Sequence, residues 1–455
     1  MIFQSINPAT DELIAEYPDT SSNEVRAALA RSAAASADWR LTTFADRARM
    51  LRRAATILRD RKAEWGTLMA REMGKPLAQG MSEAEKCAWA CEYYADNGEH
   101  FLAQVPVETD ASRSYVAWRP LGPVFAIMPW NFPFWQVIRF AAPALMAGNT
   151  AILKHAPNVG GCAEAIANLF REAGLPDEAF EVLFIDTDAA AEVIRSPEVA
   201  AVTLTGSTRA GRAVAAEAGR ALKKVVLELG GSDPYVVLSD ADVDMAATAC
   251  VTGRLLNSGQ SCIAAKRWIV TPAVADAFVR KVVDALQDQR VGDPLDEATQ
   301  VGPMARKDLR DTLHGQVTNS VSAGAVLRFG GTMPDGPGAF YPVTLLDDVA
   351  PGMPAYEEEL FGPVASILRA DDDEDALRIA NDTSYGLGAA VFTRDTNRGE
   401  RLAREHLEAG SCFVNGFVKS DPRLPFGGIK GSGHGRELSV LGIREFVNPK
   451  TVWVR

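Results

Sequence analysis

The 455-residue sequence has few of the residues that build metal centres and disulfide frameworks. It contains five histidines and six cysteines, and no two cysteines form a C-x-x-C pair. So few histidines offer no metal-ligand cluster, and cysteines this sparse exclude a disulfide-stabilised scaffold or a redox dithiol. The sequence therefore predicts a protein without a metal that works in a reducing cytoplasm.

Excess positive charge and long apolar runs are also lacking. The chain has 47 Lys and Arg against 59 Asp and Glu, which gives a net charge of −12. This balance argues against a nucleic-acid partner and against charge-driven binding to an anionic membrane. The longest uncharged run, residues 120–138, is interrupted by Pro123, Pro129 and Pro133. We therefore expect no transmembrane helix.

What is present is typical of an ordinary globular protein, with 47% hydrophobic and 23% charged residues. The first hundred residues are predicted to be mostly helical, with helices over 22–39 and 45–72. After Arg119, strand candidates alternate with helices, which predicts a parallel, doubly wound α/β sheet with ligands at the carboxyl ends of its strands. The strand candidates are 123–128, 150–154, 180–185 and 199–205, with helices expected from about 133, 160, 189 and 210.

A second α/β unit is predicted after the strand-like segment 224–229. Its strand candidates are 235–238, 268–270 and 365–368, and its helices include 242–256 and 274–289. The acidic run 371–375 precedes a helical segment, where carboxylates stabilise a helix N-terminus, so we interpret it as a solvated structural feature.

Cys262 differs from the other cysteines because it lies in the loop-like segment N-S-G-Q-S-C. A thiol exposed in a tight loop suits a nucleophile, whereas the alternative is an incidental thiol. The remaining five favour core packing: Cys87, Cys91, Cys162, Cys250 and Cys412.

Two more residues could take part in such chemistry. Glu228 is the only acidic residue of K-V-V-L-E-L, and burial there would raise its pKa towards the range of a general base. Asn131 lies between prolines and aromatics in M-P-W-N-F-P-F-W, where a fixed amide could donate to an oxyanion. The alternatives are a Glu at a strand edge and an Asn that satisfies its own turn.

Three further sites could bind charged groups. Arg139 is the only charged residue between Arg119 and Lys154, on a helix whose first residue is expected to be Pro133. It needs an anion, which either a protein carboxylate or a ligand could supply. Gly206, Ser207 and Gly211 occupy a strand-to-helix turn that could bind a pyrophosphate, and Lys154 ends a neighbouring strand. The G-x-x-x-x-G spacing of that turn is a weak dinucleotide signal.

Taken together, five motifs in this order resemble the aldehyde dehydrogenase superfamily along the whole chain: P-W-N-F-P, L-E-L-G-G, G-Q-S-C, E-E-E-L-F-G-P-V and P-F-G-G-I-K-G-S-G-H-G-R-E. The resemblance implies that Cys262 attacks the aldehyde and that Asn131 holds the oxyanion. It also implies that Glu228 activates the water that hydrolyses the thioester, because relatives that transfer the acyl group to coenzyme A usually lack this Glu. Glu437 resembles a residue proposed to assist proton relay.

The same resemblance implies a cofactor, NADP or NAD. Its contacts are expected from Trp130, Lys154, Pro157, Gly206, Ser207, Gly211, Leu229, Glu359 and Phe361. Relatives that prefer NAD often have Glu three residues after the Lys, where it repels a 2′-phosphate. Pro157 stands there in this chain, so we expect NADP to be preferred or both cofactors to be accepted.

Within the superfamily the chain looks most like bacterial short-form succinate-semialdehyde dehydrogenases. Arg139 and Ser420 match residues that bind the substrate carboxylate, but a second carboxylate-binding Arg of some relatives is Leu256 here. Lys419 or Arg423 could compensate. Glutarate semialdehyde, other short aldehydes, or a broad specificity with Arg139 paired internally remain open at this point.

The resemblance also implies three structural units and a homodimer or homotetramer. The NAD(P)-binding domain is expected over residues 1–101 and 120–231, and the catalytic domain over 232–446. A hairpin and the C-terminal strand, residues 102–119 and 447–455, are expected to form the oligomerisation element.

Overall fold

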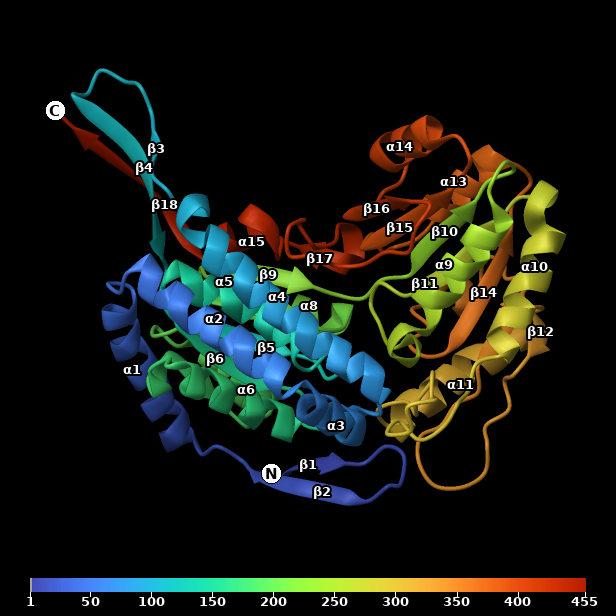
Figure 1. Cartoon of the computed structure of the whole chain (residues 1–455), viewed down its shortest axis with the longest axis horizontal. Helices are drawn as coiled ribbons and strands as arrows, with labels where there is room; N and C mark the ends of the chain where they lie inside the picture. Colours follow the sequence, from blue (N-terminus) through green and yellow to red (C-terminus); the bar gives the residue numbers. More distant parts are fainter. Residues whose placement is uncertain (1) are drawn as a thin grey trace.

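Two mainly parallel sheets organise the chain, and a third, smaller sheet projects from one end (Figure 1). The computed structural model describes residues 2–455. The alternation of strands and helices expected from the sequence is confirmed, because each of the two large sheets carries crossover helices that connect its parallel strands. None of the helices in residues 2–455 combines the length and the apolar character needed to cross a bilayer.

The first sheet has six strands in the order β17-β9-β8-β5-β6-β7. Its strands are β5 (Val124–Met128), β6 (Ala151–His155), β7 (Phe180–Val182), β8 (Ala201–Thr205), β9 (Lys224–Glu228) and β17 (Gly433–His434). Only β17 is antiparallel to its neighbour. The crossover helices are α5 (Trp135–Ala147), α6 (Gly160–Ala173), α7 (Thr187–Arg195) and α8 (Thr208–Arg220).

Four helices precede this sheet in the chain: α1 (Ser22–Trp39), α2 (Phe44–Asp60), α3 (Lys62–Met73) and α4 (Leu77–Phe101). The prediction of one helix over 45–72 was wrong. The helix breaks at Arg61, whose φ of −108° departs from helical geometry and whose guanidinium bonds both Glu64 and Glu172.

Helix α5 lies between the sheet and these helices, and all of its residues are buried. The sequence predicted a start at Pro133, but the helix begins at Trp135. A buried carboxylate caps this start, because Glu83 Oε1 accepts from the backbone N–H groups of both Phe134 and Trp135 at 2.9 Å. Any charged side chain on α5 therefore needs a partner inside the protein or a ligand.

The second sheet has seven strands in the order β12-β13-β14-β11-β10-β15-β16, and only β12 is antiparallel to its neighbour. The strands are β10 (Asp233–Val237), β11 (Ala265–Val270), β12 (Val326–Phe329), β13 (Thr344–Asp347), β14 (Val364–Arg369), β15 (Gly388–Phe392) and β16 (Ser411–Val414). The helices are α9 (Val243–Leu255), α10 (Pro272–Gln287), α11 (Lys307–Ser322), α12 (Pro354–Glu357), α13 (Asp373–Asn381) and α14 (Thr396–Glu405).

The third sheet joins segments from distant parts of the chain. Strand β18 (Val447–Val454) pairs along its whole length with β4 (Arg113–Pro120), and β4 also pairs with β3 (Val105–Pro106). This ribbon extends away from the body with the C-terminus at its tip (Figure 1). The helix α15 (Ser439–Glu445) directly precedes β18 and packs on α5.

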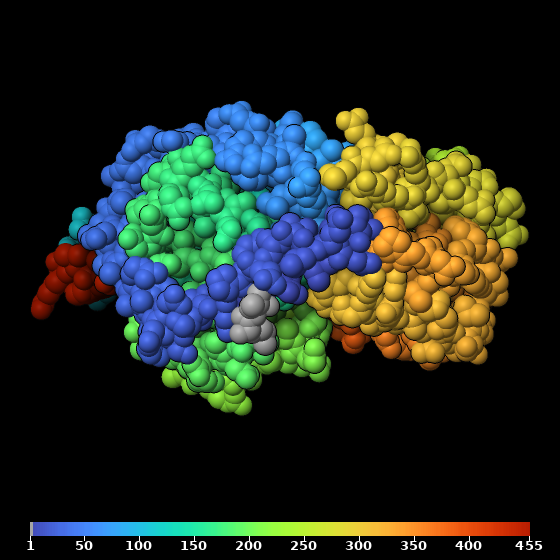
Figure 2. All heavy atoms as spheres, turned by 90° about the horizontal axis from the view of Figure 1, so that it is seen from below, coloured from blue at the N-terminus to red at the C-terminus, as the bar shows by residue number. Residues whose placement is uncertain are grey.

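The N-terminal hairpin of β1 (Ile2–Ile6) and β2 (Leu13–Pro18) lies across the two halves of the molecule (Figure 2). Its turn contacts the second half, because Asp11 Oδ2 accepts from Lys307 Nζ at 2.7 Å and from the N–H of Gly338 at 2.9 Å. These bonds tie the hairpin to the half of the molecule that carries the second sheet.

Candidate active site

Two cavities meet at Cys262 in the middle of the molecule. The first, of about 190 Å³, lies beside α4, and we call it the α4 cavity. Its polar wall residues include Gln79, Glu83, Lys86, Gln136, Arg139 and Ser420. The second, of about 210 Å³, lies at the turn before α8, and we call it the α8 cavity. Because Cys262 and Gln136 line both cavities, one sulfur can face ligands held in each.

The loop that carries Cys262 is held in an unusual backbone conformation. Asn257, Ser258 and Gly259 have φ angles of 57°, 55° and 74°, which is the left-handed region. Gly259 has no alternative, because a Cβ there would lie 2.2 Å from the carbonyl oxygen of Gly362. Lys266 Nζ donates to the carbonyl oxygen of Cys262 at 2.8 Å. Such strain persists only where neighbouring contacts enforce it, and here they fix the position of the thiol.

The Cys262 side chain is partly buried, whereas the sequence led us to expect an exposed thiol. Burial raises its pKa to about 12, although the nearby cations Arg139 and Lys266 oppose this effect. The loop position is confirmed, but the thiol and not the thiolate is favoured in the chain without ligands. The other cysteines occupy core positions, four of them fully buried and Cys412 partly buried.

Asn131 lines the α8 cavity next to Cys262 and is almost completely buried. Its Oδ1 accepts from Gln136 Nε2 and its Nδ2 donates to the carbonyl oxygen of Gln260, both at 3.0 Å. Its own carbonyl oxygen accepts from Lys75 Nζ at 3.0 Å and from Asn257 Nδ2 at 2.6 Å. These contacts fix the amide, and the second hydrogen of Nδ2 is left for a ligand.

Glu228 ends β9 and is 2% exposed. Neither carboxyl oxygen has a hydrogen-bond partner among the described residues. Burial, and then the nearby Glu437, raise the pKa of Glu228 well above its usual value. The desolvated strand Glu inferred from the sequence is therefore present. It lines neither cavity, however, because its Oε1 lies beneath Gly427, 2.6 Å from where a Cβ would be.

Arg139 lies on the buried helix α5 and reaches the wall of the α4 cavity. Its guanidinium forms an ion pair with Glu437, and its Nη2 donates to Thr205 Oγ1 at 3.2 Å. The guanidinium also lies 4.7 Å from the centre of the Phe426 ring. The sequence allowed either a protein carboxylate or a ligand as the anionic partner of Arg139. The structure supplies a protein carboxylate, that of Glu437.

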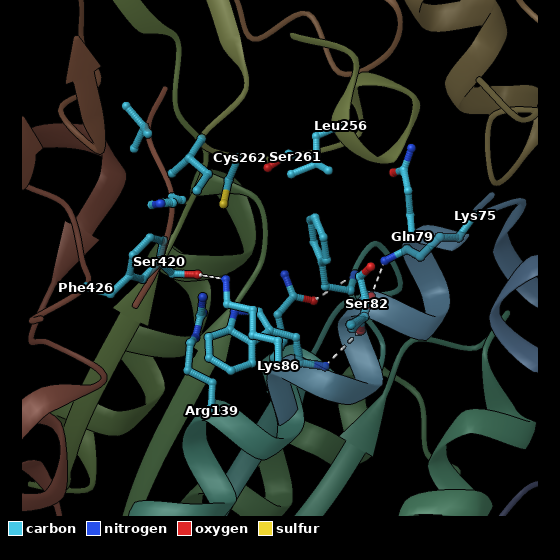
Figure 3. Close-up of a pocket in the computed structure, with 17 residues that line it drawn as sticks. Lys75, Gln79, Ser82, Lys86, Arg139, Leu256, Ser261, Cys262, Ser420 and Phe426 are labelled. Atoms are coloured by element: carbon cyan, nitrogen blue, oxygen red, sulfur yellow. Dashed lines mark hydrogen bonds and ion pairs between the residues drawn. The ribbon is translucent and has the colours of Figure 1, made fainter. Parts of the chain in front are cut away.

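Ser420 lies on the same side of the α4 cavity, and its Oγ accepts from Lys86 Nζ at 2.7 Å (Figure 3). Sequence reasoning missed Lys86. A weak signal was available, because Lys86 is a lone lysine in α4 among the buried residues Ala84, Cys87 and Ala88. The pair of Lys75 and Glu83, which is buried beside the same cavity, was missed as well.

The two residues suggested as a substitute for a second Arg at position 256 have different surroundings. Lys419 lines the α4 cavity but is exposed. Arg423 pairs with Asp421 and stacks on Trp89, and it lies outside the cavity wall. Leu256 itself lines the cavity, so an apolar side chain occupies that part of the wall.

The α8 cavity has the features needed to bind a dinucleotide. Six of the nine residues expected to contact the cofactor line it, and these are Trp130, Gly206, Ser207, Leu229, Glu359 and Phe361. Helix α8 starts directly behind the cavity, with Ser207 capping its first turn, so its unpaired N–H groups can donate to an anion. Gly211 supports the wall, because a Cβ there would lie 2.5 Å from Leu229.

Lys154 and Pro157 lie outside the wall of this cavity. Lys154 is at the carboxyl end of β6 and is partly buried, and burial lowers its pKa. Pro157 is exposed in the loop that follows β6. Their roles in cofactor choice remain predictions.

The match to known proteins extends over nearly the whole chain. Residues 1–452 match the aldehyde dehydrogenase family. The chain belongs to this family. A probable succinate-semialdehyde dehydrogenase [NADP(+)] of Synechocystis sp. is 49% identical to this aldehyde dehydrogenase over 454 residues, which cover 100% of both chains. The succinate semialdehyde dehydrogenase [NAD(P)+] Sad of Escherichia coli is 48% identical and covers 99% of this chain and 97% of its own.

A solved structure agrees with these relatives. Succinic semialdehyde dehydrogenase from Streptococcus pyogenes, in complex with NADP+, superposes on this aldehyde dehydrogenase with a TM-score of 0.97. The two are 35% identical, and the match covers 99% of each chain. The family and the fold expected from the five motifs are therefore confirmed.

Proposed function

We propose that this enzyme oxidises succinate semialdehyde to succinate and uses NADP or NAD as the hydride acceptor. The observation that carries the proposal is the position of Cys262 in the wall of both cavities. The α4 cavity has cationic groups that suit an aldehyde with a distal carboxylate, and the α8 cavity suits a dinucleotide. The names of full-length relatives at 48 to 49% identity support the same substrate and cofactors.

In this proposal Cys262 is the nucleophile and Asn131 holds the oxyanion. The Cys262 thiol gives its proton to solvent water, and its sulfur attacks the aldehyde carbon to form a thiohemiacetal. The remaining N–H of Asn131 donates to the oxygen that becomes negative. Gln136 and Lys75 act through Asn131, since their hydrogen bonds fix its amide and its carbonyl group. The residues that line the α8 cavity would hold NADP or NAD, whose nicotinamide would supply the hydride acceptor. Loss of the hydride from the thiohemiacetal carbon would leave a thioester on Cys262.

Glu228 is the proposed base for hydrolysis of the thioester. Its raised pKa suits a group that takes a proton from water at neutral pH, whereas an exposed carboxylate would be too weak a base. The carboxyl must leave its position beneath Gly427 to reach water near Cys262. Water then attacks the thioester carbon, and succinate and the Cys262 thiol are released.

The reaction can be tested by its products. Purified enzyme supplied with succinate semialdehyde and NADP should form succinate and NADPH in equal amounts without coenzyme A. A requirement for coenzyme A would contradict the role of Glu228. NADPH formation with other aldehydes but not with succinate semialdehyde would contradict the proposed substrate.

A second candidate is a broader aldehyde dehydrogenase that acts on glutarate semialdehyde or other short aldehydes. The ion pair between Arg139 and Glu437 favours it, because that pair leaves Arg139 with a balanced charge. In this case Arg139→Ala would alter the rates with charged and uncharged aldehydes by the same factor.

We also propose NADP preference or dual use, with Lys154 close to the 2′-phosphate. Pro157 brings no negative charge to this region, and Lys154 lies near the carboxyl end of β6. Initial rates measured with NADP and NAD at matched concentrations test this, and a strong preference for NAD would contradict it.

The three units predicted from the sequence remain a proposal, with the ribbon of β3, β4 and β18 as the contact between subunits of a homodimer or homotetramer. Exposed apolar side chains on or near the ribbon support this, among them Val105, Val107 and Trp453. The molar mass in solution, measured by light scattering, should fall to that of a monomer when residues 447–455 are deleted.

We further propose the reducing cytoplasm as the working compartment, because all six cysteines are unpaired in the structure.

A further inference from the structure

The charged groups around the α4 cavity are not equally balanced. Lys75 pairs with Glu83, and Arg139 pairs with Glu437. Lys86, in contrast, has no carboxylate within ion-pair distance among residues 2–455. Lys419 also lines the cavity, but it is exposed and solvated. Lys86 is therefore the cation of the inner wall whose charge the protein does not neutralise.

The surroundings of Lys86 hold the ammonium group without an anion. Its Nζ donates to Ser420 Oγ at 2.7 Å and lies 4.4 Å from the centre of the Trp135 ring. Burial, and then the nearby Arg139, lower its pKa to about 8. A partly buried ammonium in such a place gains stability when an anion binds beside it.

The cavity places this cation where a substrate tail can reach it. Figure 3 shows Lys86, Arg139 and Ser420 on one side of the cavity and the Cys262 sulfur on another. These residues come from α4, from α5 and from the segment after β16. An aldehyde at Cys262 would thus direct its distal end towards Lys86.

We propose that Lys86 binds the substrate carboxylate and sets the preference for aldehydes that carry one. This inference rests on the proposed oxidation of succinate semialdehyde and assigns its anion-binding group. Ser420 accepts from Lys86, so its own hydroxyl hydrogen is free to donate to the same carboxylate. Arg139 lines the same side of the cavity but is paired with Glu437.

The first test compares succinate semialdehyde with butanal, an uncharged aldehyde of the same chain length. Lys86→Met should lower kcat/KM for succinate semialdehyde on the order of 100-fold, mainly through KM. It should change kcat/KM for butanal less than about threefold, which also shows that the variant folds. The matched control is Lys281→Met, a lysine of α10 that lines neither cavity, which should leave both values near those of the wild type.

The second test uses pH to separate charge from shape. In the wild type the ratio of kcat/KM for succinate semialdehyde over butanal should fall above about pH 8, as Lys86 loses its proton. The ratio cancels effects on Cys262 and Glu228, which both substrates share. Lys86→Arg should keep the ratio high through pH 9, because guanidinium stays charged. The charged groups near Lys86 are Glu83 on α4, Arg139 on α5 and Asp421 after β16. The thiol of Cys87 on α4 is also close, and burial raises its pKa well above the usual value.

Two failures can be told apart. If the wild type shows no preference for succinate semialdehyde over butanal, the proposed substrate is wrong, and the role of Lys86 fails with it. If the wild type shows the preference and Lys86→Met keeps it, the substrate stands and Lys86 is not its anion-binding group. An equal loss with both aldehydes would also overturn the assignment, since it would indicate a structural role.

Discussion

The α4 cavity and the α8 cavity share Cys262 and Gln136, but the rest of their walls differ. Five charged side chains line the α4 cavity, and these are Lys75, Glu83, Lys86, Arg139 and Lys419. Among the described residues that line the α8 cavity, Glu359 alone is charged. A ligand in the α4 cavity is therefore selected by side-chain charge, whereas one in the α8 cavity meets backbone N–H groups and apolar surfaces. Substitutions can separate the two modes of recognition.

The largest effect is expected at Cys262, which belongs to both cavities. Cys262→Ala removes the nucleophile, so kcat should fall at least about 1000-fold with every aldehyde. Binding of NADPH, measured by its fluorescence, should remain within a few-fold of the wild type, because the wall of the α8 cavity is otherwise intact. Residual oxidation that still prefers succinate semialdehyde would contradict the role of this thiol.

Glu228 lines neither cavity, and its substitution should separate hydride transfer from hydrolysis of the thioester. Glu228→Gln keeps the size of the side chain but removes the base, so the steady-state rate should fall about 100-fold or more. One NADPH per active site should still form rapidly, followed by a stall at the thioester. Mass spectrometry of the stalled enzyme should find an acyl group on Cys262. Loss of the first turnover would instead indicate that Glu228 acts before hydride transfer.

Substitutions at Pro157 test recognition of the cofactor alone. Pro157→Glu introduces a carboxylate near the proposed 2′-phosphate, so kcat/KM for NADP should fall about tenfold, which corresponds to about 1.4 kcal/mol. The value for NAD should change little, and so should the ratio between succinate semialdehyde and butanal. Pro157→Gln is the control, because it has a similar side chain without the charge. Equal effects of the two variants would indicate a change in the loop and not charge repulsion.

The smallest effect concerns the reactivity of the Cys262 thiol in the free enzyme. Because burial raises the pKa of Cys262 to about 12, its thiolate fraction should grow steadily between pH 7 and pH 9. The rate of modification of Cys262 by iodoacetamide in the free enzyme should therefore rise with pH without a plateau. Cys262→Ala supplies the background from other cysteines. A plateau near neutral pH would mean that nearby cations stabilise the thiolate more than burial opposes it.

The sequence was informative about the fold because the alternation of strands and helices is regular. The cap on the start of α5 was not predicted, because its carboxylate, Glu83, lies about fifty residues earlier in the chain. A contact between segments so far apart leaves no local pattern. The break at Arg61 was missed because residues 59–63 contain neither glycine nor proline, the usual signals of a helix end.

The residues of the candidate site were likewise predicted only in part. Cys262, Asn131 and Glu228 lie in short motifs that single them out, and the structure brings Cys262 and Asn131 to one cavity wall. Lys86 lies in an ordinary helical pattern, and only the packing of α4 against α5 and the loop at Ser420 turns it into a wall residue. Glu437 was noted, but its pairing with Arg139 depends on the tertiary fold.

The most direct test of the central claim is the ratio of kcat/KM for succinate semialdehyde and butanal in the wild-type enzyme, with NADP as cofactor at neutral pH. We expect a ratio of at least about tenfold in favour of the acid aldehyde, since a carboxylate gains a charged partner in the α4 cavity. Equal values for the two aldehydes would keep the enzyme in its family but contradict succinate semialdehyde as the substrate.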